Sequence, residues 1–211
     1  EKVRYDPSQT VFDSEVEKIA ASNPEFIMMV SYPETGSLIL RTAYQKGILK
    51  SIPWLLSEGL QADNLASLIG NDTSGNYIAA GLEGLAPDLA AGGAAYDAFR
   101  EKYLAEYGRE PGIYCSNSYD ALAVVALAIE QGKNATGRSI SDNIPLVANP
   151  PGEEVSDLGE ALRLIREGQD INYQGTSGDI AFDENGDVSG SFIIWTVAEN
   201  GSIVQGEKVA V

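Results

Sequence analysis

Short runs of consecutive apolar residues alternate with helix-length amphipathic segments through residues 1–83. A run that is apolar at every position is typical of a strand buried on both faces, and such strands belong to parallel sheets. The segments between the runs have the length of the helical crossovers that join parallel strands. The pattern therefore predicts an α/β protein in which a parallel sheet is flanked by helices.

Three helices and three strands are expected in this region. Ser14 and Glu17 have the spacing of a capping box, so the first helix is expected to begin there and to end before Asn23-Pro24. Gly47 and Gly70 stand where a glycine commonly follows the last helical residue. The other two helices are expected at 34–46 and 60–69, and the strands at 26–30, 53–56 and 77–82.

Residues 84–93 are rich in glycine, alanine and proline and are interpreted as a crossing segment. Beyond this segment the sequence is mainly helical until residue 171, where it changes to strands and turns. A turn is expected at 199–201. Helices are expected at 94–107, 118–131, 139–148 and 157–167.

The Asn185-Gly186 pair lies between two apolar stretches, 180–182 and 192–197, and predicts a β-hairpin. Asp183, Asn185 and Asp187 also have the spacing that begins a calcium loop. In an EF-hand, however, glycine stands at position six and a bidentate glutamate at position twelve. Here glycine stands at position four and Ile194 at position twelve, so the hairpin is the preferred interpretation.

Composition limits the possible functions. The 211 residues contain 31 acidic and 14 basic side chains, which gives a formal net charge of −17. Such a surface repels phosphate backbones and anionic lipids, so nucleic acid is not an expected partner. Because the chain has no histidine, histidine-dependent nucleophiles, His general bases and His-ligated zinc are excluded. No Gly-x-Gly-x-x-Gly motif follows a strand, and the chain is not expected to be an enzyme.

Three further side chains are assigned structural places. Cys115 is the only cysteine, so the chain cannot form an internal disulfide. Cys115 is expected to be a buried, inert thiol. Trp54 and Trp195 lie within apolar strands and are expected in the core. The apolar run 121–129 is too short to span a membrane, and the N-terminus has no apolar signal segment.

Two residues follow consecutive predicted strands closely. Tyr32 comes two residues after Val30, and Glu58 comes two residues after Leu56. Ligands of open parallel sheets bind beyond the carboxyl ends of the strands, so these side chains are expected at one rim. A carboxylate beside an aromatic face suits a ligand that carries an ammonium group. The alternative is that Glu58 is a solvated turn residue and Tyr32 a packing tyrosine.

Several stretches, in the same order along the chain, resemble the periplasmic solute-binding proteins of ABC transporters, in the leucine/isoleucine/valine-binding class. Ser31 and Tyr32 resemble the family's ligand-side tyrosine loop, and Ser57 and Glu58 its ligand-side acidic loop. The other matching stretches are Tyr5-Asp6-Pro7-Ser8-Gln9-Thr10-Val11-Phe12, Asn23-Pro24-Glu25-Phe26-Ile27, Ser118-Tyr119-Asp120-Ala121 and 177–188.

The resemblance implies the type I periplasmic-binding fold, in which two Rossmann-like lobes close on a ligand. It assigns 1–83 to the second lobe and 84–188 to the returning part of the first lobe. Residues 189–211 would form closing strands, ending in a β-hairpin, that cross back to the second lobe. It also implies that the chain is the C-terminal portion of a longer protein and that its first lobe is incomplete.

The resemblance also implies a site and a function. Glu58 would take the ammonium group of an amino acid, and Tyr32, with Ser31 and Ser57 of the same two loops, would line that side. The protein would capture a branched-chain or other neutral amino acid outside the cytoplasm, without cofactor or metal, and deliver it to a membrane permease. The alternatives are the ectodomain of a sensor with the same fold, or a different solute such as an amide or an aromatic acid.

Overall fold

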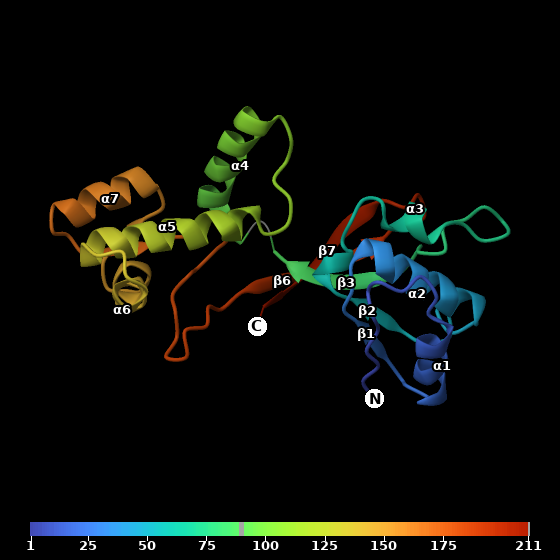
Figure 1. The fold of residues 1–211 in the computed structure, drawn as a ribbon. Coiled ribbons are helices and arrows are strands. Elements are labelled where there is room, and N and C mark those ends of the chain that lie inside the picture. Colours follow the sequence, from blue (N-terminus) through green and yellow to red (C-terminus); the bar gives the residue numbers. More distant parts are fainter. Residues whose placement is uncertain (89–90, 211) are drawn as a thin grey trace. The chain divides into compact units, whose positions relative to one another are not determined.

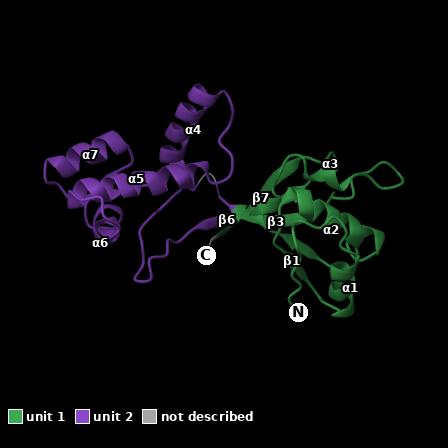
Figure 2. Cartoon of the chain, in the orientation of Figure 1, with its two compact units in different colours: residues 1–86, 192–209 green, residues 87–191, 210–211 purple. Residues whose placement is uncertain are grey.

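The structure is a computed structural model that describes residues 1–88 and 91–210 (Figure 1). The chain divides into two compact units (Figure 2). Unit 1 comprises Glu1–Ala86 and Phe192–Val209, and unit 2 comprises Pro87–Ser191 with Ala210–Val211. The predicted crossing segment 84–93 contains the boundary at 86–87, and its residues 89–90 lie outside the described residues. The assignment of 1–83, 84–188 and 189–211 to lobes stays a prediction.

A five-stranded sheet organises unit 1, with the strand order β1-β2-β3-β6-β7. β1 pairs in parallel with β2, and β2 in parallel with β3, with Met29 opposite Leu56 and Leu56 opposite Gly84. The Val197 amide donates to the Leu82 carbonyl, and the Asp88 amide donates to the Ser191 carbonyl, so β6 runs antiparallel to β3. The strands are β1 (Ile27–Met29), β2 (Trp54–Leu56), β3 (Glu83–Pro87), β6 (Ser191–Val197) and β7 (Ile203–Ala210).

Gly84 shows why a small residue is needed in the middle of this sheet. A Cβ atom at Gly84 would lie 2.3 Å from the Trp195 ring and 2.7 Å from the Leu56 carbonyl oxygen. Trp195 is fully buried and Trp54 is buried, which confirms the prediction that both tryptophans belong to the core. The missing side chain of Gly84 therefore leaves the space that the indole of Trp195 fills.

Three helices pack against one face of the sheet: α1 (Asp13–Ala21), α2 (Pro33–Gln45) and α3 (Leu65–Ile69). A short 3-10 helix, η1 (Glu58–Leu60), follows β2. Apolar helix residues such as Val16 and Leu40 join alternate strand residues such as Leu56 in a single core. The predicted α/β class, with a parallel sheet flanked by helices, is thus confirmed, and its physical basis is the burial of this common face.

Four local expectations for unit 1 are wrong. The predicted strand 77–82 does not form: residues 78–81 make turns, with Gly81 at a φ of +81°, and the strand comes at Glu83–Pro87 instead. The predicted helix 60–69 is divided into η1 and α3. The capping box does not form, because Phe12 is the N-cap and the Ser14 hydroxyl donates to Glu15. The run 26–30 is not buried on both faces: Ile27 and Met29 are buried, whereas Phe26, Met28 and Val30 are exposed.

Unit 2 is mainly helical. Its core joins α5, α6 and α7 to a two-stranded parallel sheet, and Leu127, Val147 and Tyr173 lie at its centre. Among these helices α6 contains Pro145, and the Asp157 side chain caps α7. The elements are α4 (Gly93–Tyr107), α5 (Cys115–Gly132), α6 (Gly137–Ala148), β4 (Glu153–Val155), α7 (Leu158–Arg166) and β5 (Ile171–Tyr173).

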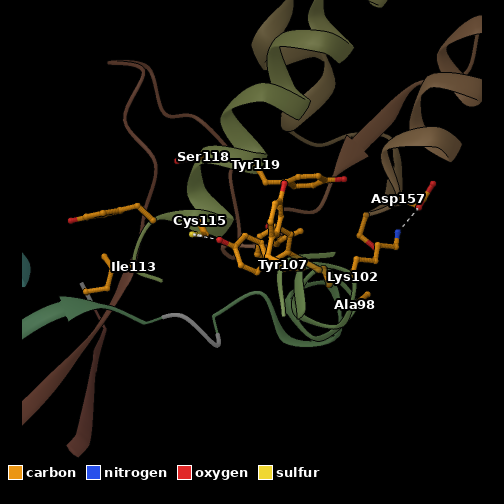
Figure 3. A pocket seen from close by; sticks show the side chains of 14 residues that line it. Ala98, Lys102, Tyr107, Ile113, Cys115, Ser118, Tyr119 and Asp157 are labelled. Atoms are coloured by element: carbon orange, nitrogen blue, oxygen red, sulfur yellow. Dashed lines mark hydrogen bonds and ion pairs between the residues drawn. The ribbon is translucent and has the colours of Figure 1, made fainter. Parts of the chain in front are cut away.

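The predicted helices of unit 2 are confirmed, although α5 begins three residues before the predicted start at 118. The turn at 183–187 is present and is closed by a bridge between Phe182 and Val188. The prediction that 180–182 and 192–197 pair as the two strands of a hairpin around this turn is wrong, because β6 lies between β3 and β7. The C-terminal hairpin is formed by β6 and β7 around the predicted turn at 199–201. Cys115 is half-buried rather than buried, with its sulfur 3.8 Å from the Tyr103 hydroxyl oxygen (Figure 3).

Candidate functional site at the sheet rim of unit 1

The structure brings the four predicted site residues together where β1 and β2 end. The Ser57 amide donates to the Met29 carbonyl at 2.9 Å, and the Ser31 amide lies 3.4 Å from the Ser57 hydroxyl. Because β1 and β2 are parallel neighbours, Tyr32 and Glu58 follow at the same edge of the sheet. Ser31, Tyr32, Ser57 and Glu58 are called the rim site below.

The four side chains differ in exposure. Ser31 and Ser57 are buried, whereas Tyr32 is 70% exposed and Glu58 is partly exposed. Within the described residues, the Glu58 carboxylate makes no hydrogen bond or ion pair. A carboxylate only accepts hydrogen bonds, and Glu58 therefore offers its full acceptor capacity to solvent or to a cationic group. The two serines hold the loops together, and a direct role for them in ligand binding stays a prediction.

Tyr5 supports the rim site and was not among the predicted residues. Its hydroxyl donates to Ser31 Oγ at 2.8 Å and lies 3.2 Å from the Val30 carbonyl oxygen. Its ring packs edge-on against Phe12, with 6.0 Å between the centroids. No periodic signal marks Tyr5 in the sequence, because Ser31 lies 26 residues away and the contact depends on the fold.

Gly59 is the second supporting residue that the sequence analysis missed. A Cβ atom at this position would lie 2.5 Å from the Ser31 carbonyl oxygen and 3.2 Å from the Tyr32 ring. The absence of a side chain therefore allows the loop after β2 to approach the loop after β1 closely. Its place directly after Glu58, at a strand-to-helix turn, is the signal that could have marked it.

The other candidate sites from the sequence have structural explanations. Asp183 accepts hydrogen bonds from the amides of Asp187 and Asn185, and these bonds lower the pKa of its carboxyl. Within residues 1–88 and 91–210, no three histidine, cysteine or carboxylate side chains form a group that could hold a metal ion. No helix in the described part of the chain is long and apolar enough to cross a membrane.

The fold is that of the type I periplasmic-binding proteins. It is similar to the leucine binding protein LivK from Thermotoga maritima, with 24% identity and a TM-score of 0.71, over 100% of this chain and 51% of that chain. It is also similar to the branched-chain amino acid transporter substrate binding protein LivJ from Streptococcus pneumoniae, solved in complex with isoleucine. That likeness has 20% identity and a TM-score of 0.64, over 98% of this chain and 51% of that chain.

The chain belongs to the family described as the receptor family ligand binding region, which matches residues 2–200. A further relative, the chemotactic signal transduction system substrate-binding protein BasB from Halobacterium salinarum, is 32% identical over 69 residues. This match covers 32% of the chain and 17% of BasB. The chain spans about half the length of the solved structures it matches. These relatives are solute-binding and receptor proteins, not enzymes, and the predicted family resemblance is confirmed.

Proposed function

We propose that this chain is the ligand-binding part of an extracytoplasmic solute-binding component of an ABC transporter. The solute is an amino acid, branched-chain or otherwise neutral, which two lobes enclose and deliver to the membrane permease. The observation that carries the proposal is the unpartnered carboxylate of Glu58 beside the exposed ring of Tyr32. The similar proteins LivK, a leucine binding protein, and LivJ, a branched-chain amino acid transporter substrate binding protein, support the same solute class.

The proposed roles follow from the geometry of the rim site. The Glu58 carboxylate accepts hydrogen bonds from the ligand's ammonium group, and the ring of Tyr32 lies against the atoms next to it. The hydrogen bonds of Ser31 and Ser57 fix both loops before the ligand arrives, which lowers the entropic cost of binding. When the site closes and excludes water, the charge pair becomes stronger.

A thermal-shift screen of the full-length protein against the amino acids, amides and aromatic acids tests the solute class. A ligand at 100 times its Kd adds about 2.7 kcal/mol to the free energy of unfolding. We expect stabilisation by neutral amino acids. Stabilisation only by acids that lack an amine would contradict the role given to Glu58.

The variant Glu58→Gln tests the site directly. Hydrogen bonds to a charged group contribute about 1.5–3 kcal/mol, so we expect the affinity measured by calorimetry to fall roughly 10- to 100-fold. Glu25→Gln removes an equal charge beside the opposite end of β1 and is the matched control. Equal affinities for the wild type and Glu58→Gln would exclude this carboxylate from the site.

A sensory role is the second candidate, because the relative BasB is a substrate-binding protein of a chemotactic signal transduction system. The same binding site would then report the ligand to a receptor instead of a permease. Deletion of the gene distinguishes the two roles: loss of uptake of the labelled ligand supports transport, and loss of movement towards the ligand with normal uptake supports sensing.

A further inference from the structure

The turn between β6 and β7 carries an exposed asparagine. Asn200 is exposed, while the neighbouring Gly201 is buried and has a φ of +82°. A Cβ atom at Gly201 would lie 2.8 Å from the Tyr77 ring, so the turn depends on this glycine. The Gly201 amide donates to the Ala198 carbonyl, and the Ala198 amide to the Ser202 carbonyl, both at 2.9 Å. These bonds close the turn and present Asn200 at the surface of unit 1.

Asn200, Gly201 and Ser202 form an N-glycosylation acceptor motif. In this motif an asparagine stands two residues before a serine or threonine, and the residue between them is not proline. Three of the eleven asparagines in the chain have this spacing, and the other two are Asn71 and Asn134. Because the motif is short, the geometry of each side chain has to distinguish the three.

The amide group of Asn200 has a bonded oxygen and a free nitrogen. Its Oδ1 accepts from the Ser202 amide at 3.0 Å and from the Ser202 hydroxyl at 2.7 Å. Within the described residues, its Nδ2 makes no hydrogen bond. Nδ2 is the atom to which a saccharide is attached in an N-glycan. The hydroxyl that the motif requires therefore holds the amide group, while the acceptor nitrogen stays unbonded.

The other two motifs lack this arrangement. Asn71 Nδ2 donates to the Gly75 carbonyl oxygen at 2.6 Å, so its acceptor nitrogen is already bonded. Asn134 accepts a hydrogen bond from the Thr136 amide, but the Thr136 hydroxyl is used as the N-cap of α6. Of the three motifs, Asn200 is thus the one in which the hydroxyl bonds to the amide of its own asparagine and Nδ2 is unbonded.

A small cavity beside the turn leaves room for a first sugar ring. Its volume is about 280 Å³, and Asn200 and Ser202 are among the residues that line it. Tyr77, Asp63 and Ser67 also line it. An aromatic ring and polar side chains are the groups against which a sugar, with its apolar faces and its hydroxyls, can pack.

The turn lies at the edge of the sheet opposite the rim site. The Val197 amide donates to the Leu82 carbonyl, and the Gly81 amide donates to the Val197 carbonyl, so β6 ends beside the start of β3. Because β1, β2 and β3 are parallel, they start at one edge of the sheet and end at the other, where the rim site is. A group attached to Asn200 therefore leaves the rim site free.

We propose that Asn200 is an N-glycosylation site. This proposal rests on the extracytoplasmic location in the proposed function, because N-glycans are attached to exported chains. The co-reactant is a saccharide linked to a lipid phosphate. A bond forms between Asn200 Nδ2 and C1 of the sugar, and the bond between C1 and the phosphate oxygen breaks. Its electron pair leaves with the lipid phosphate, and the proton lost by Nδ2 passes to a base of the transferring enzyme.

Mass spectrometry of the full-length protein isolated from its own organism tests the proposal. We expect the peptide that contains Asn200 to be heavier by one or more hexose or N-acetylhexosamine units, and fragmentation to place them on this residue. Asn185 is the matched control, because it also precedes a glycine in an exposed turn but has Asp187 where the motif needs a hydroxyl. An unmodified Asn200, or the same saccharide on Asn185, would overturn the proposal.

Variants produced in the same organism test the motif. Asn200→Gln and Ser202→Ala are expected to lose the saccharide completely, whereas Ser202→Thr keeps a hydroxyl and should retain it. Asn71→Gln is expected to leave the saccharide unchanged. Denaturing gel electrophoresis and intact mass measure the loss whether or not a variant folds. A saccharide that persists in Asn200→Gln, or one that is lost in Asn71→Gln, would place the modification elsewhere.

Labelling of intact cells with a membrane-impermeant amine reagent separates this proposal from the proposed function. A chain that is labelled but carries no saccharide on Asn200 overturns the glycosylation site alone. A chain that is neither labelled nor glycosylated overturns the extracytoplasmic location as well. The ligand affinity of Asn200→Gln, measured by calorimetry, is expected to equal that of the wild type, and a tenfold loss would contradict the separation of the turn from the rim site.

Discussion

Asp120 and Thr176 are joined by two hydrogen bonds across 56 residues of the chain. Asp120 Oδ1 accepts from the Thr176 amide at 2.9 Å and from the Thr176 hydroxyl at 3.0 Å. The other carboxylate oxygen accepts from the amide and the hydroxyl of Ser177, at 2.7 and 2.6 Å. A buried carboxylate with four donors fixes the loop after β5 against α5.

This contact also fixes the segment that enters unit 2. A Cβ atom at Gly92 would lie 2.1 Å from the Thr176 carbonyl oxygen, and one at Gly175 would lie 2.7 Å from Asp120 Oδ2. The chain before α4 and the loop after β5 therefore pack backbone to backbone around Asp120. The carboxylate is the polar centre of this part of unit 2.

Asp120→Asn is expected to destabilise unit 2 by about 1–3 kcal/mol. An amide in place of the carboxylate puts an NH₂ group opposite the donors of Ser177, so buried hydrogen bonds are lost without replacement. The measurement is hydrogen exchange of the backbone amides of residues 174–178, and we expect these amides to exchange faster in Asp120→Asn than in the wild type. Asp97→Asn, at an exposed position of α4, is the control and should leave exchange unchanged. Slow exchange in both variants would show that the contact is not needed for loop stability.

Tyr5→Phe is expected to lower the free energy of unfolding of unit 1 by about 0.5–1.5 kcal/mol. The variant keeps the ring packing on Phe12 and removes only the hydroxyl that donates to Ser31. Urea denaturation followed by tryptophan fluorescence is the measurement, because Trp54 and Trp195 both lie in unit 1. Tyr44→Phe, whose hydroxyl has no hydrogen bond within the described residues, is the control. If both variants are as stable as the wild type, the Tyr5 hydroxyl does not support the rim site.

Gly59→Ala is expected to destabilise unit 1 by about 1–3 kcal/mol, because the new methyl group would overlap the Ser31 carbonyl oxygen. The strain acts on the loops of Tyr32 and Glu58, so ligand affinity should fall as well. Denaturation and calorimetry on the same samples check both effects. Gly137→Ala meets no atom within 4 Å and should be neutral or stabilising by up to about 1 kcal/mol. A Gly59→Ala protein of wild-type stability and affinity would refute the close approach of the two loops.

Glu130→Gln is expected to change the acid sensitivity of unit 2. Arg166 of α7 and then Lys133 lower the pKa of Glu130 from 4.5 to about 2 in the folded protein. A carboxyl whose pKa is lowered by folding stabilises the fold above its unfolded pKa and loses this effect as the pH falls through the folded value. The difference in free energy of unfolding between wild type and variant should therefore be constant above about pH 5.5 and shrink between about pH 4.5 and 2.

Denaturation at a series of pH values, followed by circular dichroism, provides this difference. Asp142→Asn, which removes the carboxylate of an ion pair within α6, is the matched control for the loss of one charge. If the difference in free energy of unfolding between the wild type and Glu130→Gln stays the same down to pH 2, the ion pair between Glu130 of α5 and Arg166 of α7 does not stabilise the fold.

The sequence predicted local structure well where one strong pattern acts alone. The helix at 157–167 has apolar residues on one face, and the turns at 183–187 and 199–201 follow from Asn-Gly pairs. The strand at 83–87 was missed because Gly84 and Pro87 lower strand propensity. The strand was predicted at 77–82 instead, because that segment is richer in apolar residues. Ile78, Ala79 and Leu82 of this segment are buried although the chain turns there, and an apolar pattern alone cannot distinguish such a segment from a strand.

The sequence by itself determined that Tyr32 and Glu58 follow consecutive parallel strands, and hence that they belong to one rim, because strand direction and loop length are local properties. Only the tertiary structure decided that Tyr5 supports Ser31 and that Gly59 lets the loops meet. The physical reason is that burial depends on which surfaces meet. Hydrophobic periodicity shows which face of a helix or strand is apolar, but the covering partner comes from residues far away in the chain.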